Sequence, residues 1–384
     1  MTEPGLIVIG SGPAGVGAAE AFRTHNDTLP VRLISTDPAR PYERPPLSKD
    51  FLRGETDDVA LHPPSWFAER GIELVLGVEL DRIEPDADFV VIDGERHPYR
   101  ALVLATGAAP SPLPVAGGER ALQLRSLSDA EQLRTAASNA QSAVVVGAGF
   151  IGCEAAVSLA RRGVSVTLVA PQQFPQEKRL GPDAGRQLLK LVEQAGVRYL
   201  GGVSVDAIHD DAVQLDSGVH LEYDLVLAAT GVAPNSGAAE AAGLDIESSR
   251  VLVGADMRTS AANIFAAGDV ALAHNVTAGR RIATEHWGDS AAQGEIAGAS
   301  AAGADAEWDG VPGFWTTIGD SDVKYHAWGD GHEHARLLLH DDGFTVWYER
   351  DDVTVGVLTL NADDDYELGE RLIKDGSPAP VPMR

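Results

Sequence analysis

The chain has 384 residues, is 44% hydrophobic and carries a formal net charge of -27, with 41 glycines, 22 prolines and one cysteine. This length allows two or three cores of ordinary domain size, and the acidity, typical either of a salt-adapted source or of a plain soluble surface, argues against nucleic acid or anionic membrane as a partner. No apolar run approaches the ~20 residues that span a bilayer, the start lacks the pattern of a signal peptide, and one cysteine cannot form an internal disulfide. We therefore expect a cytoplasmic protein.

The first motif in the chain is a strand, a glycine turn and a helix. An apolar run at 6–9 leads into GSGPAG at 10–15, and an alanine-rich helix is predicted to reach Arg23. These glycines permit a tight turn, let the backbone approach a pyrophosphate and let the helix pack on the strand. A second strand is predicted at 31–35. Asp37 then lies near the spacing at which an acid binds a ribose hydroxyl, or it is a turn residue before Pro38.

The same pattern returns as AVVVGAGFIG at 143–152, followed by a predicted helix through Arg161 and a strand at 164–169. Two such units predict two dinucleotide sites. The second strand ends at Ala170, where an acid that binds a ribose 2′-hydroxyl would be expected. Gln172, Gln173, Lys178 and Arg179 follow, either as ligands of a 2′-phosphate or as surface residues. The choice between NADH and NADPH stays open.

Two further strands end in Thr-Gly, namely LVLATG at 102–107 and LVLAATG at 225–231. Each follows its glycine turn by a comparable interval, so the repeat predicts two similarly built domains, one inserted in the other. The stretch NIFAAGDV at 263–270 completes the set with a strand, a glycine and an acid that opens a helix. Asp269 there is either a helix N-cap or a ligand of a polyol chain.

These five ordered motifs, over essentially the whole chain, resemble the two-dinucleotide-binding flavoprotein reductases. The segment PYERPPLSKD at 41–50 resembles the ferredoxin reductase group, which serves oxygenases and P450s, and the apoptosis-inducing-factor-like flavoproteins. The resemblance implies an α/β fold with two Rossmann-like domains, one inserted in the other, plus a C-terminal α+β domain. It assigns 1–112 and 232–310 to FAD binding, 113–231 to NAD(P) binding and 311–384 to an interface domain.

The resemblance also implies the cofactor-binding residues. Those matched to FAD are Gly10, Gly12, Pro13, Ala14, Asp37, Arg44, Lys49, Leu80, Ala105, Arg125, Asp269, Glu285, His286, Trp287 and Trp315, with Phe314 beside the last. Those matched to NADH or NADPH are Ala148, Gly149, Phe150, Ile151, Glu154 and Gly231. Trp287 and Trp315 have the alternative reading of plain core aromatics.

Lys49 and Glu154 are the expected catalytic residues. A flavin supplies the hydride and single-electron chemistry, so the protein has to supply geometry and field. A cation such as Lys49 would stabilise the anionic reduced flavin, and a buried cation needs a partner. The resemblance implies that this partner is Glu154, so we predict a Lys49–Glu154 ion pair, although Glu154 on its own also reads as an acid favoured by the helix dipole. The prolines at 41, 45 and 46 would hold this segment rigid, and a helix is predicted to begin at 47–49.

The remaining candidate residues, a cysteine, three histidines and an aromatic pair, are interpreted as structural. Cys153 reads as a small core residue, because no second cysteine exists for a thiol relay. His332 and His334 form an HxH pattern that is more typical of a solvated loop than of zinc, and no metal is expected. His62 reads as structural, and the Trp66–Phe67 pair as core.

The expected activity is that of a ferredoxin–NAD(P)+ reductase that passes electrons singly to a [2Fe–2S] ferredoxin for an oxygenase. The alternatives are direct reduction of quinone or oxygen, and a redox-dependent association protein of the apoptosis-inducing-factor type. Three departures from the family pattern stand out: Thr36 and Ala170 replace acids, and the segment from Val311 is rich in acid, which weakens the steering of an acidic ferredoxin. The protein is expected to be a monomer or a homodimer.

Overall fold

The computed structural model describes residues 3–381, which divide into two compact units. The first unit contains 3–43, 60–109 and 233–314, and the second contains 44–59, 110–232 and 315–381. The segment 44–59, with the second half of the proline-rich stretch, therefore groups with the second unit. The finer division into FAD, NAD(P) and interface domains stays a prediction.

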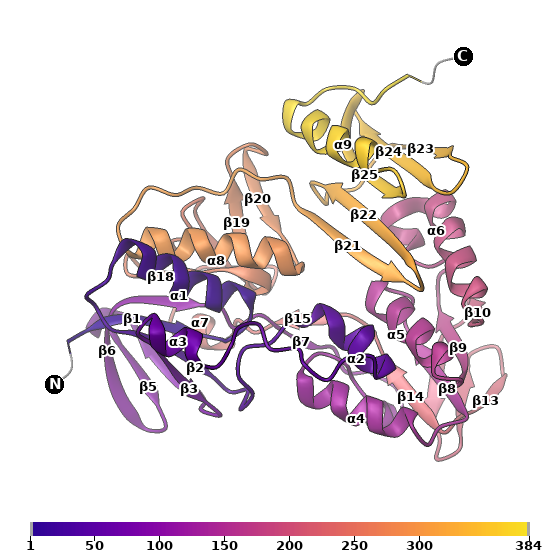
Figure 1. The fold of residues 1–384 in the computed structure, drawn as a ribbon, viewed down its shortest axis with the longest axis horizontal. Coiled ribbons are helices and arrows are strands. Elements are labelled where there is room, and N and C mark those ends of the chain that lie inside the picture. The colour runs from indigo at the N-terminus through magenta and orange to yellow at the C-terminus, as the bar shows by residue number, and fades with distance from the viewer. Residues whose placement is uncertain (1–2, 382–384) are drawn as a thin grey trace. The chain divides into compact units, whose positions relative to one another are not determined.

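A mostly parallel sheet forms the centre of the first unit (Figure 1). Its strands run in the order β3-β2-β1-β6, with β18 also parallel to β6, while β5 and β4 continue antiparallel from the start of β6. All five residues of β1 are buried, as expected for a parallel strand covered on both faces. The strands are β1 (Gly5–Ile9), β2 (Val31–Ser35), β3 (Ile72–Leu76), β4 (Leu80–Glu84), β5 (Phe89–Ile92), β6 (Glu95–Leu104) and β18 (Ile264–Ala266).

Helix α1 (Pro13–His25) packs closely along α8 (Trp287–Ala301), and Figure 1 shows the two side by side. The close approach depends on glycine in α8, because a Cβ at Gly294 would lie 2.1 Å from the carbonyl oxygen of Ala14. A Cβ at Gly298 would lie equally close to the carbonyl oxygen of Ala18. The two helices therefore meet backbone to backbone beside the first glycine turn.

The rest of the first unit consists of a smaller sheet and short helices. The sheet has the order β16-β17-β19-β20, with β17 parallel to β19 and the other pairs antiparallel. The elements are α3 (Ser65–Glu69), α7 (Gly237–Ala241), β16 (Ile246–Glu247), β17 (Arg250–Val253), β19 (Ala271–Asn275) and β20 (Arg280–Ala283). A two-stranded sheet is formed by β7 (Ala108–Pro110) and β15 (Val232–Pro234).

The second unit repeats the strand, turn and helix arrangement. Its parallel sheet has the order β10-β9-β8-β14, and a small antiparallel sheet β11-β12-β13 adds apolar side chains to the same core. The strands are β8 (Ser142–Val146), β9 (Ser165–Ala170), β10 (Arg198–Gly201), β11 (Val205–Ile208), β12 (Ala212–Leu215), β13 (His220–Glu222) and β14 (Leu225–Ala228). The helices are α2 (Asp50–Arg53), α4 (Leu127–Ala137), α5 (Phe150–Arg161) and α6 (Glu177–Gln194).

The C-terminal segment forms an antiparallel sheet with the order β21-β22-β25-β24-β23 and one helix. The elements are β21 (Gly313–Ile318), β22 (Ser321–Ala327), β23 (His334–Leu339), β24 (Phe344–Arg350), β25 (Val353–Leu360) and α9 (Asp363–Asp375). Helix α6 is broken at Gly181, where φ is 80°. The buried hydroxyl of Tyr348 donates to the carbonyl oxygen of Leu180, 3.0 Å away, so this sheet satisfies a carbonyl group next to the break.

The two glycine turns have the same backbone geometry. Gly10 and Gly147 have φ of 113° and 106°, and a Cβ on them would lie 2.1 and 2.3 Å from the carbonyl oxygens of Ala105 and Ala229. Those two alanines belong to the Thr-Gly stretches, so each first glycine lets the turn pass close to its own Thr-Gly stretch. The predicted repeat is therefore confirmed as a structural repeat, and the strands and helices around the two glycine turns lie within one or two residues of the predicted bounds. The Thr-Gly strands match less closely, because β6 begins earlier, at Glu95, and both β6 and β14 end before the Thr-Gly.

Two local predictions are wrong. Residues Pro45–Ser48 form a 3-10 turn, and the α-helix begins only at Asp50, after Lys49 adopts a non-helical backbone. Asp269 does not open a helix: it lies within the 3-10 turn Gly268–Val270, which leads directly into β19. In both cases the side chain has a hydrogen-bonding partner far along the chain, and the local sequence does not predict such a partner.

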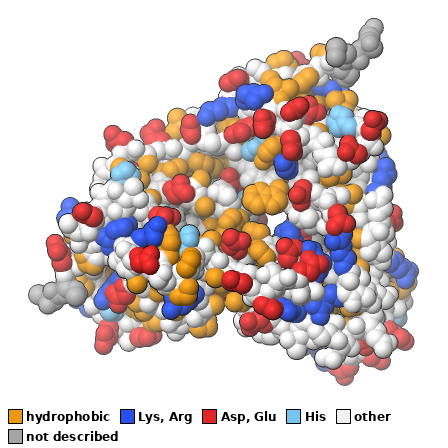
Figure 2. Space-filling model, viewed as in Figure 1, with side chains coloured by type: hydrophobic (Ala, Val, Ile, Leu, Met, Phe, Trp, Pro, Cys, Tyr) orange, Lys and Arg blue, Asp and Glu red, His pale blue; other side chains and the backbone are white. Residues whose placement is uncertain are grey.

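Acidic side chains exceed cationic ones, 57 to 30. On the face drawn in Figure 2, both signs are interspersed over the surface. No helix within 3–381 combines the length and apolar character that crossing a bilayer requires.

Candidate functional site

The first glycine turn offers a place for an anion in the first unit. Helix α1 begins at Pro13 after Gly12, and its N-cap residue makes no side-chain cap hydrogen bond, which leaves the positive end of the helix dipole without a cap. Proline at the first helical position costs nothing there, because that N–H has no intrahelical partner. Ala14 is buried against the turn, and Ala105 follows β6, where its N–H donates to the carbonyl oxygen of Ile9. The turn therefore fits the pyrophosphate of a dinucleotide.

Asp37 is fixed by its own segment. One carboxylate oxygen accepts the N–H of Ala39 at 2.9 Å, which closes a local turn, and the other accepts the hydroxyl of Tyr42 at 2.8 Å. The hydroxyl of Ser35, at the end of β2, accepts from both Ser11 and the N–H of Asp37. The turn reading of Asp37 is thus confirmed, while its role toward a ribose stays a prediction.

Helix α8 supports Asp269. The hydroxyl of Ser290 donates to the Asp269 carboxylate at 3.2 Å, and the side-chain oxygen of Gln293 accepts the N–H of Gly268 at 2.9 Å. Both supporting side chains are buried. They hold the turn in one conformation, and no sequence pattern singles out either residue.

Glu285 and His286 stand just before α8 and are tied down separately. Glu285 pairs with Arg250 at 2.5 Å, and Arg250 also donates to the backbone oxygen of Asp269. The His286 ring stacks on Phe314 with centroids 4.2 Å apart. Arg250, which was not predicted, therefore connects two of the predicted FAD residues.

Asp289, in the first turn of α8, is a further residue that sequence reasoning missed. Its side chain is buried, and within 3–381 its Oδ2 has no hydrogen-bond partner. Burial raises its pKa to about 7, which the N–H of Gly313 offsets only in part. The carboxyl group is therefore poised to titrate near neutral pH.

In the second unit, the proline-rich segment presents Lys49 to α5. Pro45 and Pro46 fix φ through the 3-10 turn, and the Lys49 ammonium group donates to the carbonyl oxygen of Pro45 at 2.9 Å. The same group lies 2.9 Å from Oε2 of Glu154, so the predicted ion pair is confirmed. The Lys49 side chain is 13% exposed and that of Glu154 only 3%.

Two hydroxyl groups complete the surroundings of Glu154. Ser48 donates to Oε2 at 2.5 Å and Thr316, from β21, donates to Oε1 at 2.6 Å. Ser158, one turn further along α5, donates to the backbone oxygen of Ser48 at 2.7 Å. Glu154 therefore joins three segments that are far apart in the sequence.

The ion pair and the hydrogen bonds to its carboxylate make the burial of Glu154 tolerable. A carboxylate taken out of water without partners costs several kcal/mol. Two hydroxyl donors and a cation compensate for most of that loss. The sequence predicted the ammonium partner by family resemblance, but no local signal pointed to Ser48 or Thr316.

The second glycine turn holds the residues predicted for the nicotinamide dinucleotide. Helix α5 begins after Gly149 without a side-chain cap, as α1 does, so this turn also fits a pyrophosphate. A Cβ at Gly149 would meet only the Gln176 amide, at 3.9 Å, which leaves the turn open. Ile151 is 48% exposed, whereas Ala148 is buried. Gly231 follows β14 with φ of 99°.

The remaining predicted FAD residues are distributed over both units. Leu80 begins β4 in the first unit, and Arg44 precedes the 3-10 turn in the second. The backbone N–H of Arg125 donates to Asp129 at the capped start of α4. Trp315 is 56% exposed, so its reading as a core aromatic is wrong, and Trp287 is half-buried at the start of α8.

Cys153 and the histidines have local structural explanations. Cys153 is fully buried, which raises the pKa of its thiol to about 12 and confirms the core reading. His62 stacks on Trp66 at 3.8 Å, and Phe67 is buried. His332 lies against the ring of Tyr348 at 4.6 Å, and burial lowers its pKa. Among the residues that the structure describes, no three His, Cys, Asp or Glu side chains gather as a metal site would require.

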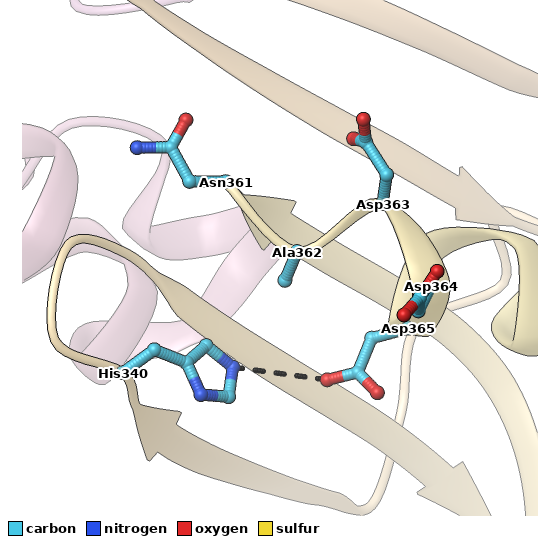
Figure 3. A pocket seen from close by; sticks show the side chains of 6 residues that line it. All are labelled: His340, Asn361, Ala362, Asp363, Asp364 and Asp365. Carbon is cyan, nitrogen blue, oxygen red and sulfur yellow. Dashed lines mark ion pairs between the residues drawn. The ribbon is translucent and has the colours of Figure 1, made fainter.

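A pocket of about 520 Å³ lies at the start of α9 and shares no residue with the predicted site. Figure 3 shows His340 facing Asp365 there, with the two side chains 3.7 Å apart. Thr345 donates to the same carboxylate at 2.5 Å. The pocket is lined by His340, Asn361, Ala362, Asp363, Asp364 and Asp365.

Known proteins resemble this chain over most of its length. The family model of pyridine nucleotide-disulphide oxidoreductases matches residues 4–306. The chain belongs to that family. It is 30% identical to putidaredoxin reductase of Pseudomonas putida over 97% of this chain and 92% of that protein. It is 32% identical to the ferredoxin–NAD(+) reductase component of the anthranilate 1,2-dioxygenase system of Burkholderia cepacia, over 84% of this chain and 82% of that protein.

The fold of this pyridine nucleotide-disulphide oxidoreductase agrees with that of a solved relative. Putidaredoxin reductase, in its covalent complex with putidaredoxin, superposes with a TM-score of 0.93 at 29% identity, over 98% of this chain and 94% of that one. The predicted α/β fold with two Rossmann-like parts is confirmed. Despite the family's name, the chain has a single cysteine, which excludes a redox disulfide formed within it.

Proposed function

We propose that the chain is an NAD(P)H-dependent FAD flavoprotein, a ferredoxin–NAD(P)+ reductase that passes electrons singly to a [2Fe–2S] ferredoxin of a P450 or Rieske oxygenase system. The observation that carries this proposal is the buried Lys49–Glu154 pair beside a glycine turn that fits a dinucleotide. It is supported by the reductase names of the relatives.

The chain's residues would divide the work as follows. The first glycine turn, Asp37 and Asp269 would hold FAD, and the second glycine turn would hold the nicotinamide dinucleotide. When bound, FAD supplies the hydride acceptance and single-electron release. Lys49 would place a fixed positive charge toward the flavin, and Glu154 would keep that charge oriented.

The activity is tested on the purified FAD-loaded chain with NADH and with NADPH. We expect reduction of cytochrome c to depend on an added [2Fe–2S] ferredoxin and to exceed direct turnover of quinone or oxygen. Faster direct turnover would favour the quinone or oxygen reductase. No acceleration of flavin reoxidation by any ferredoxin, with a dimer appearing on reduction, would favour an association protein of the apoptosis-inducing-factor type.

The role of Lys49 is tested by Lys49→Met. Methionine has similar length but no charge, so we expect flavin reduction by NADH to slow by at least about tenfold, the size of effect that removal of one fixed charge commonly has. Stopped-flow absorbance of the flavin measures the rate. The exposed Lys190→Met variant, on α6, is the control, and an unchanged rate in Lys49→Met would contradict the proposed role.

A cytoplasmic location and a monomer or homodimer stay predictions. Size-exclusion chromatography with light scattering on the oxidised and reduced protein addresses the second.

A further inference from the structure

The end of β9 is where a Rossmann domain discriminates between a ribose 2′-hydroxyl and a 2′-phosphate. In this chain β9 ends at Ala170, whose methyl group can neither accept a hydrogen bond from a 2′-hydroxyl nor bind or repel a 2′-phosphate. Two of the four residues that sequence reasoning put forward for a 2′-phosphate are engaged elsewhere. The Arg179 guanidinium lies 5.4 Å from the ring centroid of Tyr325, and a Cβ at Gly202 would clash with the Gln173 amide, which therefore packs against that glycine.

A carboxylate is held by the loop that follows β9. Glu177, the first residue of α6, folds back over the loop that follows β9, and its Oε2 accepts the backbone N–H groups of Gln173 at 2.9 Å and Phe174 at 3.3 Å. Within 3–381 its Oε1 accepts no hydrogen bond. The side chain is half-buried, so one oxygen is anchored and the other is open.

The same loop reaches the second glycine turn. The N–H of Gln176 donates to the carbonyl oxygen of Ala148 at 3.3 Å, and its side-chain amide is the group nearest to Gly149. The hydroxyl of Tyr199 fixes the other end of the loop by donating to the carbonyl oxygen of Gln172 at 3.0 Å. Glu177 is therefore held at a fixed place, next to the turn that would carry the pyrophosphate.

We propose that Glu177 replaces the acid that is missing at the end of β9 and makes the protein select NADH over NADPH. The proposal rests on the proposed function and adds the nucleotide that it uses. A ribose 2′-hydroxyl can donate to the open Oε1, as it does to an acid at the end of the strand in other Rossmann domains. A 2′-phosphate would meet a like charge, and the two backbone N–H groups that could bind it are already taken.

The expected selectivity is large. Like charges within a few ångströms, at the edge of a site, should favour NADH over NADPH by about 100-fold in kcat/KM for flavin reduction. Glu177→Gln keeps an oxygen that can accept the same two N–H groups, so the loop should stay in place while the charge is lost. We expect the preference to fall at least about tenfold, mainly through better use of NADPH.

Binding without turnover gives an independent readout. Isothermal titration of the FAD-loaded protein with ADP-ribose and with 2′-phospho-ADP-ribose should reproduce the preference, and Glu177→Gln should reduce it by a similar factor. Glu193→Gln, which removes an exposed acid further along α6, is the matched control and should leave both ratios unchanged. Glu177→Asp, with the charge kept but drawn back, should retain the preference for the unphosphorylated ligand.

The outcomes separate the two proposals. A wild-type protein that prefers NADPH, or a ratio that does not change in Glu177→Gln, overturns the role of Glu177 and leaves the reductase standing. Flavin that is reduced by neither nucleotide overturns the reductase itself.

Discussion

At the residue scale, Glu154 is the most completely satisfied charge of the candidate site. Its two oxygens receive Ser48, Lys49 and Thr316, from two segments that lie on either side of α5 in the sequence. Ser48 and Thr316 hold the Glu154 carboxylate in place. That carboxylate, rather than solvent, then holds the ammonium group of Lys49. The orientation of Lys49 should therefore depend on residues that do not contact it.

Thr316→Val tests this dependence. The change keeps the shape of the side chain but leaves Oε1 of Glu154 without its donor, so we expect a loss of about 1–3 kcal/mol in the free energy of unfolding. Flavin reduction should slow as well, because the carboxylate can turn away from Lys49. Urea unfolding and stopped-flow absorbance measure the two effects.

The controls for Thr316→Val lie in the same strand. Thr316→Ser restores the hydroxyl group and should recover both properties. Thr317→Val removes an exposed hydroxyl that pairs with Asp322, and should change neither. Equal rates in the wild type and Thr316→Val would show that Thr316 has no positioning role.

Asp289 gives a prediction about pH. Its folded pKa of about 7 is above the ordinary value of 3.8, so between these values the folded state binds more protons than the unfolded state. This group therefore makes the protein less stable as pH rises from about 4 to about 7, and has no further effect above that range. Asp289→Asn cannot titrate, so relative to the wild type it should gain stability across the same window.

The measurement for Asp289 is the difference in free energy of unfolding between the two proteins at pH 5 and at pH 8. Taking the difference cancels the other titrating groups, which both proteins share. A difference that stays constant with pH would contradict the raised pKa.

At the element scale, the contact of α1 with α8 determines how the first glycine turn is supported. Gly294→Ala would place a methyl group 2.1 Å from the carbonyl oxygen of Ala14, and neither backbone can yield without moving its helix. We expect a loss of about 3 kcal/mol or more in the free energy of unfolding, together with weaker FAD retention. Urea unfolding and the flavin content after dialysis measure these effects.

Gly288→Ala is the matched control in the same helix. A Cβ at Gly288 meets nothing within 4 Å, and alanine is favoured over glycine in a helix by about 0.5–1 kcal/mol. This variant should be as stable as the wild type or slightly more so. Similar losses in both variants would show that the spacing between the helices is not the cause.

At the scale of the whole molecule, the net charge of -27 governs encounters with a partner. Ferredoxin is expected to meet the protein through the C-terminal segment, and the first turn of α9 alone carries Asp363, Asp364 and Asp365. Repulsion between two acidic proteins is screened beyond about 8 Å at physiological salt. For an acidic ferredoxin, we therefore expect the second-order rate of electron transfer to rise as salt increases from about 0.02 to about 0.3 M.

Stopped-flow reduction of the ferredoxin across this salt range measures the dependence. A neutral acceptor of small size is the control and should show no trend. A rate that falls with salt would mean that a local cationic surface overrides the net charge at the docking site.

Local sequence patterns were enough to predict the elements that repeat at short range. Glycine is required at 10 and 147, because a Cβ there would lie 2.1 and 2.3 Å from a carbonyl oxygen. The spacing of such glycines in the sequence predicted both dinucleotide turns and the strands around them. The pair of Lys49 with Glu154 came from resemblance to a family, because nothing within either local segment requires it.

The groups that satisfy the buried charges, in contrast, follow from the packing of the folded chain. Hydrogen bonds from Thr316 to Glu154, from Ser290 to Asp269 and from the loop after β9 to Glu177 join residues by their place in the fold. The helix predicted to begin at 47–49 begins at Asp50 instead, and Ser48 and Lys49, which precede it, contact Glu154. A buried carboxylate takes its partners from whatever the packed chain brings within about 3 Å, and local pattern does not encode that distance.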